Sequence, residues 1–167
     1  NLDRVLQRCE RTNLDLNWVK WHFMVNDGIV SRHKISERGI QVDKAKVDAI
    51  EKMPCPKDIK GIWSFLGYVG LYMRFIKYFS KFSRPLTNLL QKDVPFVFDD
   101  DCVEAFEILK KALISAPIVH PPDWNLPFEI MCDASDYAIG AVLGQRVDKI
   151  LSVIHYASKT LDSAQRN

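Results

Sequence analysis

The sequence lacks the cysteine and histidine patterns that define several classes of protein. Its four cysteines form no Cys-x-x-Cys pair, and its four histidines form no His-Glu-x-x-His motif. This spacing argues against a structural zinc site and against a secreted disulfide framework, and it favours reduced intracellular thiols. We expect Cys9 and Cys132 to lie in core positions.

Long apolar runs are also absent. No run approaches the roughly 18 residues that a membrane-spanning helix needs, and residues 1–4 begin an amphipathic pattern unlike a signal or transit peptide. The expected location is therefore intracellular, in cytoplasm or nucleus, without a membrane partner. The chain starts with Asn1 and not with Met, which indicates a piece of something longer.

The composition that remains is typical of a folded domain with an uneven charge distribution. The 167 residues are 47% hydrophobic and 26% charged, with a net charge of only +2. Residues 54–92 nevertheless contain seven Lys and Arg against one acid, whereas residues 93–136 contain ten acids against two lysines. The first segment suits contact with a polyanion, and the second does not.

Hydrophobic spacing predicts helices and strands in separate stretches. Helical spacing occurs in five ranges, which are 2–12, 44–53, 59–76, 80–90 and 100–113. A small ribbon is expected within 20–42, with a turn at Asp27-Gly28, and three strands at 127–132, 138–145 and 150–157. Asp43, Ser80 and Asp99 are expected to begin helices, with Pro85 near a first turn, and 158–167 to be a loop.

The stretch MCDASDYAIGAVLGQR, residues 131–146, contains the most informative carboxylate. Asp133 follows an apolar run and precedes the small residues Ala134 and Ser135. Two interpretations are open. The local pattern favours a turn or a hydrogen-bonded strand-end aspartate, and the same position on a strand also suits a metal-binding carboxylate. Ser135 and Asp136 fit a turn.

Three ordered segments resemble the Pol polyproteins of gypsy-type LTR retrotransposons, and more narrowly their plant members. They are DIKGIWSFLGYVGLYMRFIKYFSKFSRPLTNLL, FVFDDDCVEAFEILKKALISAPIVHPPDWNLPFEIMCDASDYAIGAVLGQ and IHYASKTLDSAQRN. The resemblance covers essentially the whole chain. It implies the end of a reverse-transcriptase palm, then thumb and connection, then the start of ribonuclease H.

The resemblance divides the chain into three parts and implies an α+β fold. Residues 1–53 resemble the end of the palm with a primer-grip-like ribbon, 54–92 a helical thumb-like module, and 93–167 the connection and a truncated ribonuclease H-like domain. The last part is expected to be a helix packed on an incomplete antiparallel sheet. Ser31 and Arg32 stand where the family's ribbon has Leu-Gly before His33, which is a departure from the pattern.

The resemblance also implies which chemistry is present. Asp133 resembles the first metal-binding carboxylate of ribonuclease H, which uses two Mg²⁺ ions held by several carboxylates. The second would be a glutamate on a helix beyond Asn167. The Tyr-x-Asp-Asp turn of the polymerase has no match, since the only Asp run, 99–101, suits a helix start. We therefore expect the chain alone to be inactive in both reactions and to bind no Mg²⁺ stably.

The implied partners are an RNA–DNA hybrid or duplex and the rest of Pol. Contact would be sequence-independent and salt-sensitive, through Lys57, Lys60, Arg74, Lys77, Lys81 and Arg84. The alternative is a non-catalytic nucleic-acid-binding or interaction module from a degenerate or domesticated retroelement, whose unfinished sheet would expose an apolar face. Most tyrosines of the helical segment, and the four tryptophans, are expected to pack inside the fold.

Overall fold

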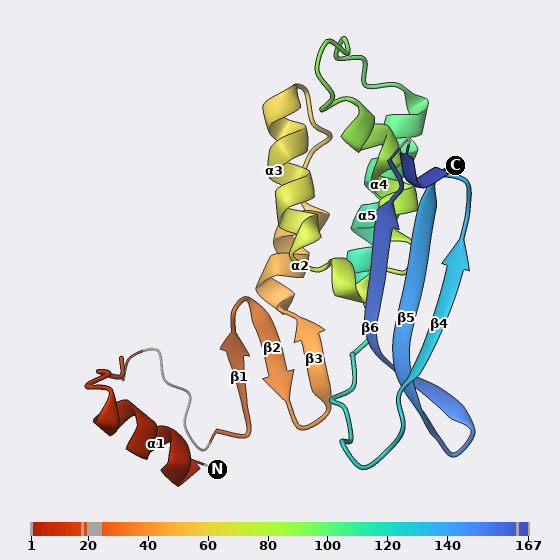
Figure 1. Ribbon diagram of the computed structural model, residues 1–167. Coiled ribbons are helices and arrows are strands. Elements are labelled where there is room, and N and C mark those ends of the chain that lie inside the picture. The colour runs from red at the N-terminus through yellow and green to blue at the C-terminus, as the bar shows by residue number, and fades with distance from the viewer. Residues whose placement is uncertain (1, 18, 20–24, 163, 167) are drawn as a thin grey trace.

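The computed structural model describes residues 2–17, 19, 25–162 and 164–166, and its architecture is α+β. Five α-helices and two three-stranded antiparallel sheets lie within these residues, which confirms the predicted fold class. Helix α1 (Leu2–Arg11) stands apart, whereas the other helices are grouped beside both sheets (Figure 1). None of the helices in the described ranges has the length and apolar content that crossing a bilayer requires.

The small sheet is formed by β1 (Asp27–Val30), β2 (His33–Ser36) and β3 (Gly39–Val42) in that order. The predicted turn at Asp27-Gly28 is wrong, because both residues lie in β1 and Asp27 pairs with Ser36. The turn falls instead at Ser31-Arg32, whose φ angles of 48° and 69° match the type I′ geometry of a two-residue hairpin. The expected extended positions Trp21 and Phe23 lie outside the described residues.

The helical layer consists of α2 (Lys44–Glu51), α3 (Ile59–Gly70), the short 3₁₀ helix η2 (Met73–Phe75), α4 (Phe79–Asn88) and α5 (Asp100–Ile114). Aspartates begin three of these helices by accepting a bond from a first-turn N–H. Asp58 accepts from Gly61 at 2.6 Å, Asp43 from Ala45 at 3.2 Å and Asp99 from Cys102 at 3.0 Å. The predicted roles of Asp43 and Asp99 are confirmed.

Helix α4 begins differently from the prediction. Its N-cap residue is Tyr78, in a left-handed conformation with φ 59° and ψ 31°, and Ser80 lies inside the first turn. Ser80 is not free to cap because its backbone N–H and Oγ both bond to Ser158 Oγ, at 2.9 and 3.0 Å. Pro85 lies inside α4, beyond its first turn, so the helix lacks one backbone hydrogen bond there.

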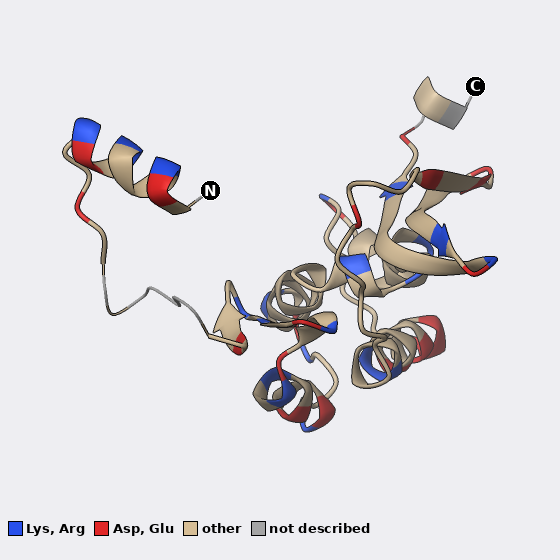
Figure 2. Ribbon diagram, turned by 90° about the horizontal axis from the view of Figure 1, so that it is seen from below, with Lys and Arg blue, Asp and Glu red and all other residues tan. Residues whose placement is uncertain are grey.

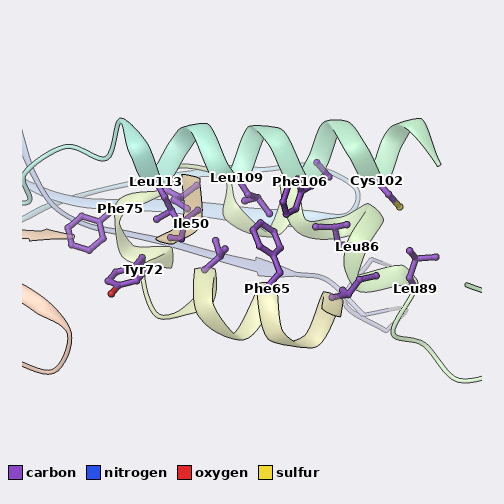
Figure 3. Packing of buried hydrophobic residues seen from close by; sticks show 14 of the residues in the cluster. Ile50, Phe65, Tyr72, Phe75, Leu86, Leu89, Cys102, Phe106, Leu109 and Leu113 are labelled. Carbon is purple, nitrogen blue, oxygen red and sulfur yellow. The ribbon is translucent and has the colours of Figure 1, made fainter. Parts of the chain in front are cut away.

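The hydrophobic core lies where α3, α4 and α5 meet (Figure 3). Phe65 of α3 and Phe106 of α5 are both fully buried, and their ring centroids are 4.5 Å apart at 44°. Leu86 of α4 and Ile50 of α2 complete the same cluster without measurable exposure. The core is thus built by residues at the helical spacing that the sequence shows.

The large sheet is formed by β4 (Glu129–Ala134), β5 (Ala138–Val147) and β6 (Ile150–Thr160) in that order. Asp148 and Lys149 form the second hairpin turn, with φ angles of 50° and 68°. The prediction of a loop over 158–167 is wrong at its start, because β6 continues to Thr160, which pairs with Ala138. The short helix η3 (Ala164–Arg166) follows.

Backbone contacts join the two sheets to the segment after α5. Ile40 of β3 pairs with Val119 through N–H···O bonds of 2.8 and 2.9 Å, and the N–H of His120 donates to Val153 of β6 at 3.1 Å. Gly39 has φ 128°, and a side chain at this position would collide with the Val119 carbonyl. The same short segment therefore holds the ribbon and the large sheet together.

A buried glutamine fixes the proline-rich connection before β4. Gln145 is only 3% exposed. Its amide accepts from the N–H of Asp123 at 2.9 Å and donates to the carbonyls of Asp123 and Leu126 at 2.6 and 3.0 Å. These bonds satisfy the polar atoms of the buried side chain. They also hold the backbone of the connection in place, although it forms no helix or strand.

Several burial predictions are wrong. Cys132 is exposed and Cys9 only half-buried, whereas the buried thiol belongs to Cys102. Trp63 and Trp124 are 62% and 81% exposed, so they do not pack in the core. The predicted exposed apolar face of the large sheet is confirmed: Ile130 and Ile139 share one face of β4 and β5, and Ile130 is 68% exposed.

We predict that Phe106→Ala lowers the free energy of unfolding by about 3–5 kcal/mol, because it leaves a cavity between α3 and α5. Trp63→Ala on α3 is the matched control and should change stability by no more than about 0.5 kcal/mol. Urea denaturation followed by far-UV circular dichroism measures both. Equal losses in the two variants would contradict the placement of the core.

Candidate metal and nucleic-acid sites

Asp133 lies on strand β4 and not in a turn. Its cross-strand partner is Gly140 of β5, and its side chain is exposed. The carboxylate oxygen Oδ2 accepts a hydrogen bond from the hydroxyl of Tyr78 at 3.1 Å. Tyr78 is 55 residues earlier in the chain, so no local sequence pattern could have indicated this partner.

The absence of a side chain at Gly140 allows Tyr78 to approach. A Cβ atom there would lie 3.1 Å from Tyr78 Cδ1 and 3.3 Å from Cε1, which is closer than side chains normally pack. Gly140 is buried beneath the ring. The start of α4 therefore rests on the same face of the large sheet that carries Asp133.

Two hollows flank the Asp133–Tyr78 pair. Lys81, Ser135 and Ser158 line one of them, of about 190 Å³, together with the pair. Lys77, Met131 and Val142 line the other, of about 100 Å³. Each hollow thus has a lysine on the helical side and the single carboxylate on the strand side.

The described residues do not fit a two-metal centre. Two Mg²⁺ ions require several carboxylates or other hard oxygen ligands, but no group of three or more His, Cys, Asp and Glu that could hold an ion occurs in the described part of the chain. Ser135 makes a turn, as predicted: its Oγ donates to the carbonyl of Ala138 at 3.1 Å, and the Ala138 N–H bonds back to Oγ at 3.2 Å. Among the residues that the structure describes, Asp133 is the only carboxylate lining either hollow.

The six predicted nucleic-acid-binding residues fall into two groups. Lys57 and Lys60 flank the start of α3, which is about 18 Å long. Arg74, Lys77, Lys81 and Arg84 follow one another from η2 into α4 at the other end of that helix. Basic and acidic positions both occur along the helices in the ribbon view of Figure 2.

Two of these basic side chains lie over aromatic rings. The guanidinium of Arg84 lies 4.1 Å from the Tyr137 ring centroid, and it shares a hollow with Asp99 and Asp101. The ammonium of Lys77 lies 4.8 Å from the Tyr78 ring centroid, but Lys77 is exposed. Lys77 and Lys81 are exposed, whereas Arg84 is half-buried, so the two lysines offer the more accessible charge.

Arg74 lies close enough to His155 of β6 for its charge to change the pKa of the imidazole. Burial, and next the positive charge of Arg74, lower the pKa of His155 below its ordinary value. Both effects favour the neutral imidazole.

The ribbon turn is held against the helical layer. The hydroxyl of Tyr72 donates to the carbonyl of Arg32 at 3.1 Å, and the His33 ring packs edge-on against Tyr72 with centroids 5.4 Å apart. Burial is the main cause of the raised pKa of Tyr72. Packing was correctly expected for Tyr72, whereas Tyr78 is used differently, as the partner of Asp133.

Cys102 and Asp99 form a coupled pair at the start of α5. Hydrogen bonds from the thiol and backbone N–H of Cys102 hold the pKa of Asp99 below its ordinary value. Burial, followed by the Asp99 carboxylate, raises the pKa of the Cys102 thiol to about 11. This pair is structural, which agrees with the expectation that the Asp run begins a helix.

Sequence comparison assigns the chain to a class of proteins. Residues 98–167 match the family described as the RNase H-like domain found in reverse transcriptase. Over all of its length the chain is 36% identical to the retrovirus-related Pol polyprotein from transposon 412 of Drosophila melanogaster, and 34% identical to that from transposon opus of the same fly. A Tf2-3 transposon polyprotein of Schizosaccharomyces pombe is 34% identical over 98% of the chain.

The chain covers only 14%, 18% and 12% of these three relatives. Solved structures agree at the level of the fold. A foamy viral protease-reverse transcriptase in complex with RNA/DNA hybrid matches 84% of this chain, and 19% of that one, with TM-score 0.73 and 19% identity. The same enzyme with dsDNA matches 85% of this chain and 30% of that one, with TM-score 0.71 and 19% identity.

These matches define a reverse-transcriptase-associated segment with a ribonuclease H-like part. The chain is similar along its length to a segment of retrotransposon Pol polyproteins, and its residues 98–167 match the ribonuclease H-like domain found in reverse transcriptase. The resemblance to the family is thereby confirmed. The narrower plant-like assignment stays a prediction, since the relatives named above come from a fly and a yeast.

We predict that Cys102 resists alkylation at pH 8 while Cys55 and Cys132 react. The latter two side chains are exposed, whereas a thiol of pKa about 11 is ionised in only about one molecule in a thousand at this pH. Peptide mass spectrometry after iodoacetamide treatment, with and without urea, measures each site. Rapid labelling of Cys102 in the folded protein would show that the start of α5 is not packed in this way.

Proposed function

We propose that this chain is a framework segment of a retrotransposon RNA-directed DNA polymerase and ribonuclease H, and that it holds nucleic acid without catalysing either reaction by itself. In this proposal residues 1–53 are the palm end with a primer-grip-like ribbon, 54–92 are the thumb-like module, and 93–167 are the connection and truncated ribonuclease H-like part. The observation that carries the proposal is the match to Pol polyproteins along the whole chain.

The arrangement of carboxylates supports the proposed inactivity. Asp133, the proposed first ribonuclease H carboxylate, has a phenol and two lysines around it and no second acid. An isolated carboxylate holds Mg²⁺ weakly. The only run of aspartates, 99–101, begins α5, where Asp99 caps the helix, and so it does not serve nucleotidyl transfer.

The basic segment supports nucleic-acid binding. Arg74, Lys77 and Lys81 follow closely along the chain, and Lys77 and Lys81 are exposed at the start of α4. The foamy viral enzymes of similar fold are described in complex with dsDNA and with RNA/DNA hybrid. We infer that this chain contacts the backbone of a hybrid or duplex, with Lys57 and Lys60 as a second, separate contact. Such contacts are charge-driven and sequence-independent.

A second function is favoured by one observation, the exposed apolar face of the large sheet. Ile130 and the exposed Cys132 lie on this face of β4, and Ile139 lies on the same face of β5, opposite Ala134. A non-catalytic interaction module from a degenerate or domesticated retroelement would use such a face to bind a protein partner. The two functions are distinguished by salt, because apolar contact is not weakened by moderate salt whereas phosphate contact is.

We predict that the chain binds a fluorescent RNA–DNA hybrid with an affinity that falls steeply between 50 and 200 mM salt, in the manner of phosphate contacts. Replacing Lys77 and Lys81 together by alanine should reduce the slope of log affinity against log salt by about two, since about one unit is lost for each phosphate contact. Fluorescence anisotropy measures the slope.

Lys111→Ala is the matched control, because Lys111 is an exposed lysine on α5 outside the proposed surface. It should leave the slope unchanged. Binding that ignores salt, or an equal effect of Lys111→Ala, would count against the proposed surface and in favour of the interaction module.

We predict no cleavage of a hybrid by the purified chain in Mg²⁺ or Mn²⁺, because the described residues supply one carboxylate where the reaction needs several. Gel electrophoresis of a labelled hybrid measures cleavage. Cleavage that persists through purification and is abolished by Asp133→Asn would overturn the proposed inactivity.

A further inference from the structure

We infer that Tyr78 is a latch that closes the start of α4 over Asp133, so that a phenol of the thumb-like module occupies this carboxylate in place of a metal ion. The inference deepens the proposed function and rests on Asp133 being the first ribonuclease H carboxylate.

The geometry of the latch begins with Tyr78 itself. The tyrosine has φ 59° and ψ 31°, a left-handed conformation that bulky residues rarely adopt. Such a conformation persists where the surroundings hold it in place, and it clusters at functional sites. Here the holding contacts are the hydroxyl bond to Asp133 Oδ2 and the bare backbone of Gly140 beneath the ring.

A neighbouring contact closes the same end of the helix. Two residues after Tyr78, the N–H and Oγ of Ser80 bond to Ser158 Oγ of β6 at 2.9 and 3.0 Å. Tyr78 thus reaches β4 while Ser80 holds β6, with Gly140 of β5 between them. The start of α4 is fixed across all three strands, so the bond to Oδ2 of Asp133 breaks only if Tyr78 rotates away or the helix moves.

The charges around the latch oppose a metal ion. Lys77 lines the hollow on one side of Asp133 and Lys81 lines the hollow on the other. A divalent cation entering either hollow would approach an ammonium group as well as the carboxylate. The phenol can donate a hydrogen bond to the carboxylate without adding charge, so it suits this setting and a metal ion does not.

The test is a titration of the full ¹⁵N-labelled chain with Mn²⁺, which broadens the amide signals of residues near a bound ion. Wild type should show no selective broadening at residues 132–134 and Gly140. Tyr78→Phe keeps the ring and removes the hydroxyl, and it should increase apparent Mn²⁺ affinity at these amides by about tenfold, as expected for the loss of a hydrogen bond to a charged group.

Three variants complete the design. Asp133→Asn in the Tyr78→Phe background should abolish the broadening. Tyr68→Phe is the matched control, because it also removes a phenol hydroxyl, which bonds to the Lys46 carbonyl at 3.4 Å, and it should behave as wild type. Tyr78→Asn removes the ring with a residue that tolerates left-handed backbone, and it should bind Mn²⁺ at least as tightly as Tyr78→Phe.

Selective Mn²⁺ broadening in wild type would overturn the latch, as would wild-type behaviour in both Tyr78 variants. Salt-dependent hybrid binding does not require Asp133. The slope of log affinity against log salt in Lys77→Ala/Lys81→Ala therefore tests the proposed function separately. Failure of the latch with an intact salt slope would therefore remove this inference alone.

Discussion

The contact between Phe65 of α3 and Phe106 of α5 is the interaction on which the other elements depend. It joins helices from the two halves of the chain, and no other ring pair in the described residues connects buried side chains more closely. Buried residues of α2, α4 and η2 pack around this pair in the core. Only when these helices are packed do the ribbon and the large sheet have a surface to rest on, through Tyr72 on one side and Tyr78 on the other.

Local chemistry predicts much of this fold, and long-range contact decides the rest. Apolar spacing found α3 and α5, and Asp43 and Asp99 marked helix starts because capping needs only nearby N–H groups. The turn predicted at Asp27-Gly28 is wrong because strand pairing with β2 overrides the turn tendency of these two residues. The helix start predicted at Ser80 is wrong because the Ser80 hydroxyl bonds to Ser158, which is 78 residues away. Trp63 and Trp124 show that residue type alone does not fix burial.

The candidate site likewise has a part that the sequence predicts and a part that depends on long-range contacts. The position of Asp133 at the end of an apolar run and its family resemblance single it out from sequence, but its surroundings come from α4, which no spacing connects to β4. Likewise the basic segment is visible in the charge count, whereas the pairing of Arg84 with Tyr137 and its proximity to Asp99 emerge only in three dimensions. A count of lysines and arginines therefore does not show which of these charges are exposed.

The backbone pairing of Ile40 with Val119, beside Gly39, has a consequence for inheritance. Because the ribbon meets the segment after α5 through main-chain atoms, this junction is insensitive to the identity of most neighbouring side chains. A retroelement copy can accumulate many substitutions and keep it. A single missense change at the Gly39 codon, however, would place a side chain against the Val119 carbonyl in a backbone conformation that favours glycine, so one nucleotide would be enough to strain this junction.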